Sequence, residues 1–397
     1  MKNFNKELYS SLKFIDISKV LSQDIWSIQN KKNKEENERK TYLLLKNFIK
    51  IIYKSIFYKP KIKLSTNGNN DIFYIRTYSR SDVDEHSSYY ENIDGTSLCI
   101  LSHMDQKFDF INCIYSIFFL LKLTYSLKLV LNNKSIKLLS YNGLKLYFIL
   151  FSSISDSQKI FPKLVLHPKL VSFQQMTPTE NMLCQLANIN NLKTFALEQG
   201  IGFYKEDGYY WEKYPVTTYL NSVCKNILCW GEFSRTIFKK HTNARTFIIG
   251  KASLPNFNKF EEGVTFVFQN KDCESANKEL FDIFYYLEKE GIPTSRWFKT
   301  KGDIIIKNSV GRDGPLRKIV IGCSSNLLLE LGYLGLKVLI TKNSTLANSI
   351  PKNITINDPI DVIQRDLNDY PHDSWKNFIE CTGDESVKRY KALLFEN

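Results

Sequence analysis

The 397-residue sequence has no long uninterrupted hydrophobic segment, and its first residues lack the apolar stretch found in signal peptides. The most apolar run, residues 111–121, lies between Asp109 and Lys122 and is too short to cross a bilayer. The sequence therefore argues against export and against a membrane-spanning segment. It predicts a cytoplasmic protein.

Spacings typical of metal sites and disulfide frameworks are also missing. The eight cysteines are scattered, and even the closest pair, Cys224 and Cys229, has no recognised ligand spacing. We expect buried, reduced thiols. The segment Asp82-Val83-Asp84, with His86, resembles a short acidic motif for a divalent ion, but three residues in a polar loop often occur by chance. No metal ion is predicted.

What the chain does contain is apolar residues and an excess of positive charge. Hydrophobic residues make up 43% and aromatic residues 14%, enough for sizeable cores, and the length predicts two domains. The net charge of +13 indicates an anionic partner: nucleotide phosphates, an acidic glycan, an anionic membrane surface or nucleic acid. A basic, apolar helix predicted over 42–54 fits two roles, packing on the first domain or contacting a membrane surface.

Apolar runs of strand and helix length alternate along the chain, which predicts parallel sheets with helices on both faces. Strands are predicted at 72–77, 97–101, 127–131, 164–166, 193–196, 226–234, 264–268, 303–307, 318–321 and 337–340. Helices are predicted at 108–123, 144–151, 179–188, 275–289 and 325–334. The predicted fold class is α/β, with two Rossmann-like lobes (1–240 and 241–374), a cleft between them, and a C-terminal helix (375–397) that packs back on the first lobe.

Two strand ends carry polar residues that could perform chemistry. The apolar run 193–197 ends at Glu198 and continues into a glycine-containing loop, Gln199-Gly200-Ile201-Gly202-Phe203-Tyr204. A second strand, 317–322, is followed by Cys323-Ser324-Ser325-Asn326 and an apolar helix. In open α/β sheets ligands bind outside the carboxyl ends of the strands, so both junctions are candidate site loops.

The two junctions resemble motifs of a known enzyme group. The Glu198 loop is similar to the acid-acid-Gly loop of bacterial sialyltransferases and capsule polysialyltransferases, and the serine pair is similar to their paired-serine motif. These enzymes have the two-lobed GT-B plan, and the resemblance covers roughly residues 178–342. Two departures stand out. Gln199 replaces the second acid, and residues 295–301 replace the His-Pro motif that binds CMP, so sugar transfer is better supported than sialic acid transfer.

The resemblance implies a metal-independent glycosyltransferase and assigns roles to individual residues. A carboxylate can deprotonate the acceptor hydroxyl, and a helix N-terminus can bind the departing phosphate. The candidate bases are Glu198 and His103; the acceptor loop contains Gln199, Gly200, Gly202 and Tyr204; the candidate donor-binding residues are Ser324, Ser325, Asn326, Arg296, Lys299 and Lys301. Structural roles remain open for each: a carboxylate bonded to backbone amides, a serine N-cap, and solvated basic side chains.

The expected partners are a nucleotide-sugar donor and an anionic or lipid-linked glycan acceptor, such as a capsule or lipooligosaccharide. No cofactor and no nucleic acid partner are expected, and contact with the inner face of the cell membrane is an open alternative. Two other functions also remain open. One is a polyol-phosphate or sugar-phosphate transferase of the teichoic-acid type, and the other is a non-enzymatic basic module that binds nucleic acid or an anionic membrane.

Overall fold

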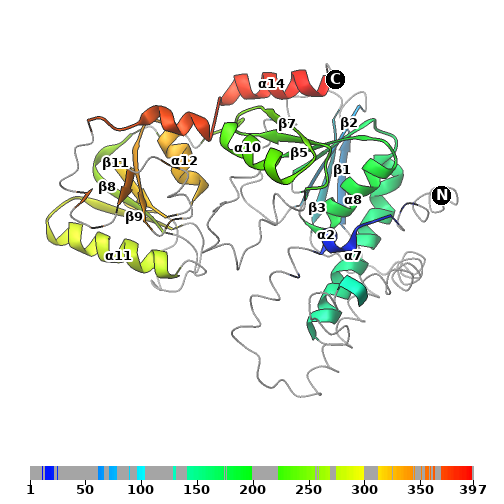
Figure 1. Ribbon diagram of the computed structural model, residues 1–397, viewed down its shortest axis with the longest axis horizontal. Coiled ribbons are helices and arrows are strands. Elements are labelled where there is room, and N and C mark those ends of the chain that lie inside the picture. Colours follow the sequence, from blue (N-terminus) through cyan, green and yellow to red (C-terminus); the bar gives the residue numbers. More distant parts are fainter. Residues whose placement is uncertain are drawn as a thin grey trace.

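A computed structural model describes the parts of the chain that form two α/β lobes (Figure 1). The described residues are 11, 14–21, 25, 61–66, 71–77, 89, 96–102, 128–130, 141–173, 175, 177–198, 222–254, 257, 259–268, 274–298, 312–323, 325–342, 344, 350, 354–356, 358, 361–362 and 368–395.

The first lobe is built on a seven-stranded sheet with the order β1-β3-β2-β4-β5-β6-β7. Its strands are β1 (Lys61–Thr66), β2 (Ile72–Thr77), β3 (Thr96–Ser102), β4 (Lys169–Ser172), β5 (Lys193–Leu197), β6 (Asn226–Cys229) and β7 (Arg245–Ile248). All neighbouring pairs are parallel except β1 with β3, which are antiparallel. The parallel strands are short and mostly buried, as expected for a sheet covered on both faces.

The second lobe contains a six-stranded sheet with the order β10-β9-β8-β11-β12-β13. Its strands are β8 (Glu261–Phe268), β9 (Thr294–Phe298), β10 (Arg312–Asp313), β11 (Arg317–Gly322), β12 (Lys337–Thr341) and β13 (Thr355–Ile356). Only β10 pairs in the antiparallel sense. Two mainly parallel sheets, one in each lobe, confirm the predicted two-lobed α/β fold class of the GT-B type.

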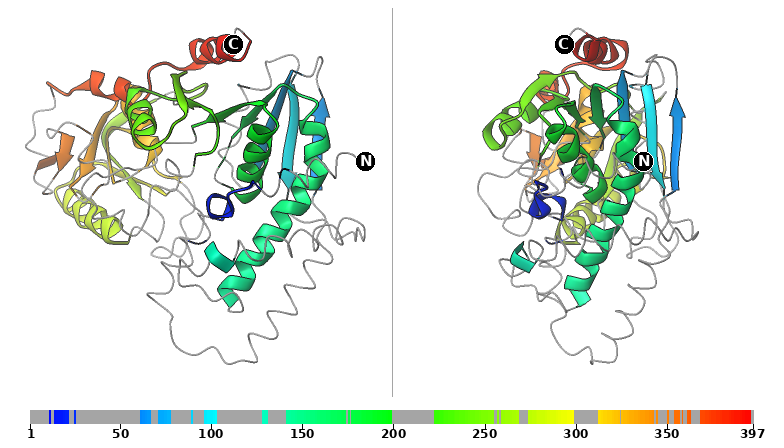
Figure 2. Two further views of the ribbon diagram at one scale, coloured as in Figure 1. Left: turned by 45° about the vertical axis from the view of Figure 1, so that its right-hand side comes forward. Right: turned by 90° about the vertical axis from the view of Figure 1, so that its right-hand side faces the viewer.

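Helices cover both faces of the first sheet. On one face, α7 (Tyr141–Leu164), α8 (Pro178–Ile189) and the short α2 (Ile17–Val20) bury alternate strand residues such as Phe73 and Leu170. The neighbouring positions Ile72, Tyr74 and Val171 point to the other face and pack with α14 (Gly383–Phe395). Figure 2 shows α14 lying along this lobe, away from α7 and α8. Alternation along each strand thus produces a three-layer lobe.

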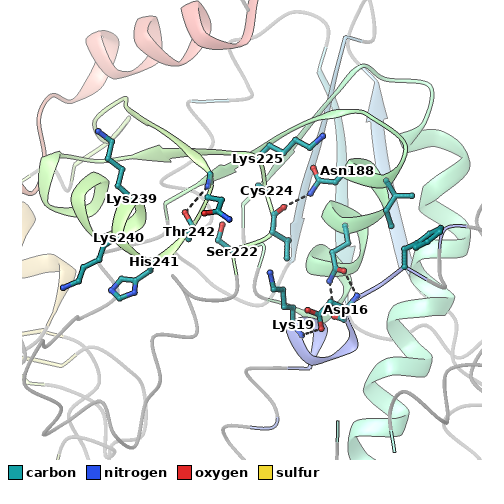
Figure 3. Close-up of a pocket in the computed structure, with 16 residues that line it drawn as sticks. Asp16, Lys19, Asn188, Ser222, Cys224, Lys225, Lys239, Lys240, His241 and Thr242 are labelled. Carbon is teal, nitrogen blue, oxygen red and sulfur yellow. Dashed lines mark hydrogen bonds between the residues drawn. The ribbon is translucent and has the colours of Figure 1, made fainter. Parts of the chain in front are cut away.

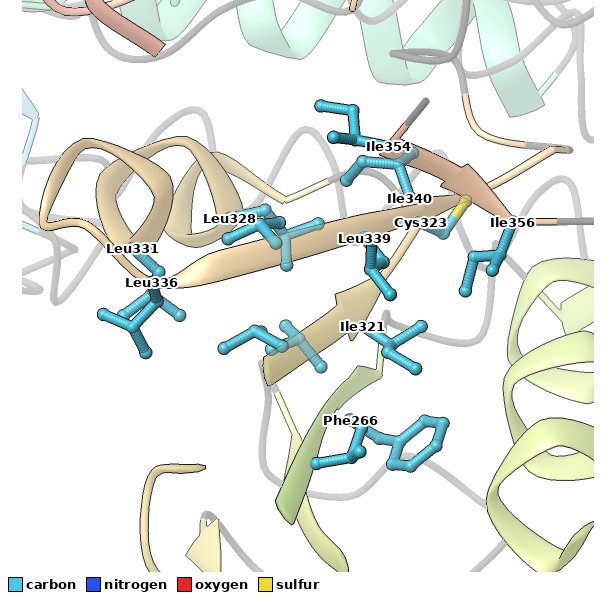
Figure 4. Close-up of a cluster of buried hydrophobic side chains, with 14 of the residues drawn as sticks. Phe266, Ile321, Cys323, Leu328, Leu331, Leu336, Leu339, Ile340, Ile354 and Ile356 are labelled. Carbon is cyan, nitrogen blue, oxygen red and sulfur yellow. The ribbon is translucent and has the colours of Figure 1, made fainter. Parts of the chain in front are cut away.

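The second core follows the same rule (Figure 4). The helix α11 (Glu274–Lys289) packs on Phe266, whose ring lies edge-on to Phe284 at 5.4 Å. On the other face lies α12 (Asn326–Tyr333), with Leu328 against Gly322 so closely that an added Cβ would lie 2.7 Å from it. The two helices therefore occupy opposite faces of the sheet.

In the described part of the chain two segments cross between the lobes, and they lie side by side. The outward crossing follows β7 and includes Gly250 and Lys251; the returning one includes Glu380, Cys381 and Thr382. The amide of Lys251 donates to the carbonyl of Cys381 at 2.9 Å, and the two segments form a short parallel bridge. Gly250 has φ 78° and lies so close to Cys381 that a side chain would overlap its carbonyl.

The boundary between the lobes and the start of the C-terminal helix differ from the predicted positions. The division at residue 240 precedes β7, which still pairs with β6, so the crossing lies beyond Ile248. The 3-10 helix η4 (His372–Asn377) packs in the second lobe through Trp375, and the helix that returns to the first lobe, α14, begins only at Gly383.

Two predicted strands are wrong. Residues 164–166 end or follow α7, and 128–130 are helical, because a short apolar run does not by itself distinguish a buried helix from a strand. The predicted strand 226–234 ends at Cys229, and a helix that the sequence did not suggest, α10 (Glu232–His241), follows it. The predicted segments 42–54, 108–123 and 303–307 lie outside the described residues.

Candidate functional site

Each sheet has one point at which the direction of strand addition reverses. In the first lobe β3 and β4 lie on opposite sides of β2, and in the second β9 and β11 lie on opposite sides of β8. Such switch points leave a crevice outside the carboxyl ends of the strands, where α/β proteins bind ligands. The second switch point, between β8 and β11, opens directly onto the N-terminus of α12.

The residues after β11 form the start of this helix. Ser325 is the N-cap: its Oγ accepts a hydrogen bond from the amide of Leu327 at 3.3 Å, and the side chain is almost fully buried. Asn326 begins the helix, and its Oδ1 is buried with no hydrogen-bond donor among the described residues. The N-terminal amides of a helix attract anions, and this end lies at a switch point. Ser324 itself lies outside the described residues.

Glu198 occupies a different position from the one predicted. It follows β5, so β4 separates it from the switch point of its lobe, and its side chain is only 4% exposed. Its Oε2 accepts from the amide of Trp230 at 2.7 Å, and its Oε1 accepts from Ser234 Oγ at 2.5 Å. The prediction of a carboxylate open to an acceptor is wrong in this structure, because both oxygens bond to the junction between β6 and α10.

This burial changes the acidity of Glu198. Removal from water raises the pKa of its carboxyl group to about 7, although the hydrogen bonds from Ser234 and Trp230 act in the opposite direction. The carboxyl group thus changes its protonation state near neutral pH, inside the first lobe.

A set of buried groups joins Glu198 to the second lobe. Trp230 donates to Glu198, accepts from the amide of Glu380 through its carbonyl at 2.9 Å, and places its ring 4.9 Å from the Lys251 ammonium group. Lys251 in turn forms a buried ion pair with Glu330 of α12. The two side chains are 1% and 6% exposed, so this contact between the lobes is shielded from solvent.

The predicted basic residues do not gather around the serine helix in the part of the chain that is described. Arg296 lies in β9, level with Phe266 and Ile321. Its guanidinium group stacks over the ring of Phe284 at 5.2 Å, on the α11 face of the sheet, whereas α12 packs on the opposite face. The structure therefore separates Arg296 from Ser325 because successive strand residues point to opposite faces.

The remaining predicted site residues lie outside the described part of the chain. These are His103, Gln199, Gly200, Gly202, Tyr204, Lys299 and Lys301. Among the described residues, no group of three or more His, Cys, Asp or Glu side chains could hold a metal ion. No helix within those residues has the length and apolarity needed to span a bilayer.

Sequence reasoning did not predict the buried ion pair that connects the lobes. Lys251 follows an apolar strand and a glycine, a weak local signal for a buried lysine. Nothing near Glu330 indicates its partner, which lies 79 residues away in the sequence. His167, predicted to terminate a strand, instead contacts the end of α7 through Nδ1 and the Lys163 carbonyl at 2.8 Å.

Replacement of Glu198 by glutamine should flatten the pH dependence of stability. The native carboxyl holds its proton up to about pH 7, whereas an unfolded glutamate loses it near pH 4.5. The protonated Glu198 therefore contributes fully to the free energy of unfolding below pH 4.5. This contribution, about 3 kcal/mol, is lost as the pH rises to 7. Urea unfolding between pH 4.5 and 8 should show this slope in the wild type and not in Glu198→Gln.

Glu232→Gln is the matched control, since it neutralises a carboxylate of the adjacent helix that is 44% exposed. It should preserve the slope. With both oxygens of Glu198 bonded inside the lobe, we expect Glu198→Gln to keep kcat within about tenfold of wild type. A loss of about 10²–10⁴-fold would instead support the predicted general base.

Neither protein-family models nor curated proteins match the chain. Among solved structures, a glycosyltransferase from Rickettsia africae shares 10% identity over 83% of this chain and 98% of its own, with a TM-score of 0.42. Arabidopsis thaliana UGT89C1 complexed with quercetin shares 8% sequence identity over 89% of this chain and 95% of its own, with a TM-score of 0.41. The UDP-N-acetylglucosamine 2-epimerase of Rickettsia bellii shares 10% sequence identity over 81% of this chain and 92% of its own, also with a TM-score of 0.41. With TM-scores below 0.5, the fold assignment rests on the two parallel sheets of the chain itself.

Proposed function

We propose that the protein is a glycosyltransferase that moves a sugar from a nucleotide-sugar donor to a glycan acceptor. The observation that carries the proposal is the position of the α12 N-terminus at the switch point of the second sheet. Transfer from such a donor releases a nucleotide phosphate, and a helix N-terminus stabilises that negative charge. The motif resemblance of the Glu198 and Ser324-Ser325 loops supports the same reaction.

In this proposal the donor phosphates lie at the start of α12, between the lobes. The amides and the Ser324 hydroxyl donate hydrogen bonds to them, while Ser325 holds the helix start through its cap. The unpartnered Oδ1 of Asn326 suits a hydroxyl or amine group of the ligand. Lys299 and Lys301 follow the carboxyl end of β9 in the sequence and supply positive charge, and the Gln199–Tyr204 loop receives the acceptor.

The acceptor is proposed to be an anionic or lipid-linked surface glycan, of the kind used for capsules or lipooligosaccharides. The net charge of +13 supports an acidic acceptor and a location at the inner face of the cell membrane. His103 is the proposed general base, since Glu198 is bonded within its own lobe.

Thermal stabilisation by nucleotides tests the donor class. CMP, UDP, GDP and their common sugar conjugates should be screened, because a ligand that binds only the native state raises its melting temperature. We expect one base to stabilise the protein in both its free and its sugar-linked forms. Failure of every nucleotide, together with stabilisation by oligonucleotides, would contradict the proposal.

Substitution of Asn326 by aspartate tests the phosphate site directly. The new carboxylate lies in the first turn of α12, where the helix dipole favours a negative charge and offsets part of the cost of burying it. The same charge repels a bound phosphate, and we expect nucleotide affinity to fall at least about tenfold, equivalent to about 1.4 kcal/mol. Titration calorimetry with the stabilising nucleotide measures the change.

Asn191→Asp provides the control. Asn191 is exposed in the first lobe and has φ 61°, a backbone conformation that aspartate also tolerates. It adds the same charge away from the site and should leave nucleotide affinity unchanged. Equal affinities for the two variants would place the phosphate elsewhere.

A further inference from the structure

A cavity of about 610 Å³ lies in the first lobe, at the amino ends of β6 and β7 (Figure 3). Its walls come from α2, the end of α8, the segment before β6, and the end of α10 with the turn that follows it. Glu198 and Trp230 lie at the opposite, carboxyl edge of the same sheet, about 13 Å away along a four-residue strand. The cavity is therefore separate from the proposed donor site, and its volume suits a small organic ligand.

The charged residues that line this cavity are mainly basic. They are Lys19, Lys225, Lys239, Lys240 and, when protonated, His241; the acidic one is Asp16. Asp16 Oδ1 accepts hydrogen bonds from the amide and hydroxyl of Ser18 at 3.0 and 2.5 Å, so this carboxylate caps α2. Among the described residues, Lys225 and Lys239 have no carboxylate partner within 4 Å, and both are exposed.

Several neutral polar groups of the walls form hydrogen bonds within the protein. Asn188 donates to the Val223 carbonyl at 2.6 Å, and Ser222 donates to Gln175 at 3.1 Å. The Thr242 hydroxyl donates to the Phe238 carbonyl at 2.9 Å. What the cavity offers a ligand is thus chiefly positive charge rather than a set of neutral donors.

Stabilisation of helix C-termini accounts for only some of these basic residues. Lys239, Lys240 and His241 lie in the last turn of α10, where cations offset the partial negative charge of the helix C-terminus. Lys19 lies in the last turn of the short helix α2 and has the same role there, whereas Lys225 precedes β6 and has no such role. Basic residues from three separate elements line one cavity, and their summed positive charge favours an anion with more than one charge.

We propose that this cavity binds a ligand with at least two phosphate charges, at a site distinct from the nucleotide-sugar site. Lys239 and Lys240 of α10 line one side of the cavity, and Lys19 of α2 and Lys225 before β6 line the others. Phe14, 65% exposed at the rim, provides an apolar contact beside the basic residues. Either a soluble diphosphate compound or the headgroup of an anionic lipid has this chemistry.

Calorimetric titration with inorganic pyrophosphate tests the site. Lys225→Glu/Lys239→Glu should weaken pyrophosphate binding more than tenfold, and added salt should weaken it in the wild type. Lys278→Glu/Lys289→Glu changes the net charge equally on exposed positions of α11 in the other lobe and should bind as the wild type does. Lys225→Gln/Lys239→Gln repeats the test without a reversed charge at the end of α10 if the first variant unfolds.

Binding to lipid vesicles distinguishes a soluble diphosphate compound from a lipid headgroup as the ligand. Co-sedimentation is measured with phosphatidylcholine vesicles, with and without one-fifth phosphatidylglycerol, for the same variants and for Phe14→Ser. A lipid headgroup predicts binding to the anionic vesicles that is lost in the lysine variant and in Phe14→Ser. A soluble ligand predicts pyrophosphate binding that Phe14→Ser does not change. If neither probe separates the cavity variant from the α11 control, the proposal is overturned.

Discussion

Replacement of Glu330 by glutamine is expected to lower the free energy of unfolding by about 3–5 kcal/mol, because it removes one partner of a buried ion pair. Lys251 then keeps its ammonium group in a position that is 1% exposed, beside the ring of Trp230 but without the carboxylate. The pair joins the two lobes, so both should lose stability together. Urea unfolding followed by tryptophan fluorescence measures the change.

The exposed pair Lys318–Glu262 provides the control, with side chains 58% and 79% exposed. Glu262→Gln should cost no more than about 1 kcal/mol, since solvent screens such pairs. The double variant Lys251→Met/Glu330→Leu removes both charges and should recover most of the loss, because apolar replacement of a buried pair is often neutral. A Glu330→Gln variant as stable as Glu262→Gln would contradict a structural role for the pair.

Replacement of Trp375 by alanine is expected to cost about 3–5 kcal/mol. Its side chain is fully buried in the second core, and its ring lies so close to Gly332 of α12 that a Cβ there would be 2.4 Å from it. Its Nε1 donates to Tyr370 Oη at 2.9 Å, and that hydroxyl group bonds with the backbone of Val338. Alanine leaves both a large cavity and a lost donor; thermal and urea unfolding report the sum.

Trp375→Phe separates the two contributions, because it keeps most of the apolar contact and removes the indole donor. It should lose clearly less stability than Trp375→Ala. Phe395→Ala, at a side chain that is 48% exposed at the end of α14, should have little effect. Comparable losses for the alanine variants of Trp375 and Phe395 would show that η4 does not stabilise the second lobe.

The sequence by itself determined the class of fold and most of its parallel strands. β2 was predicted at its observed bounds, and β5, β8, β11 and β12 were placed to within a few residues, because buried parallel strands are continuous apolar runs between turn residues. The helix α12 and its serine cap were also predictable, since capping depends on neighbours in the chain. The sequence was sufficient to predict those features that depend on residues close to one another in the chain.

The tertiary structure decided what surrounds the polar residues. In the sequence Glu198 is an acid at a strand end, yet in the structure it bonds to Trp230 and Ser234, which follow the next strand. Burial raises the pKa of its carboxyl group, although these two hydrogen bonds lower it. Arg296 points to the α11 face rather than toward Ser325 because of its register in β9. Burial and register depend on which distant segments pair, and Lys251 and Glu330 become partners only when the two lobes meet.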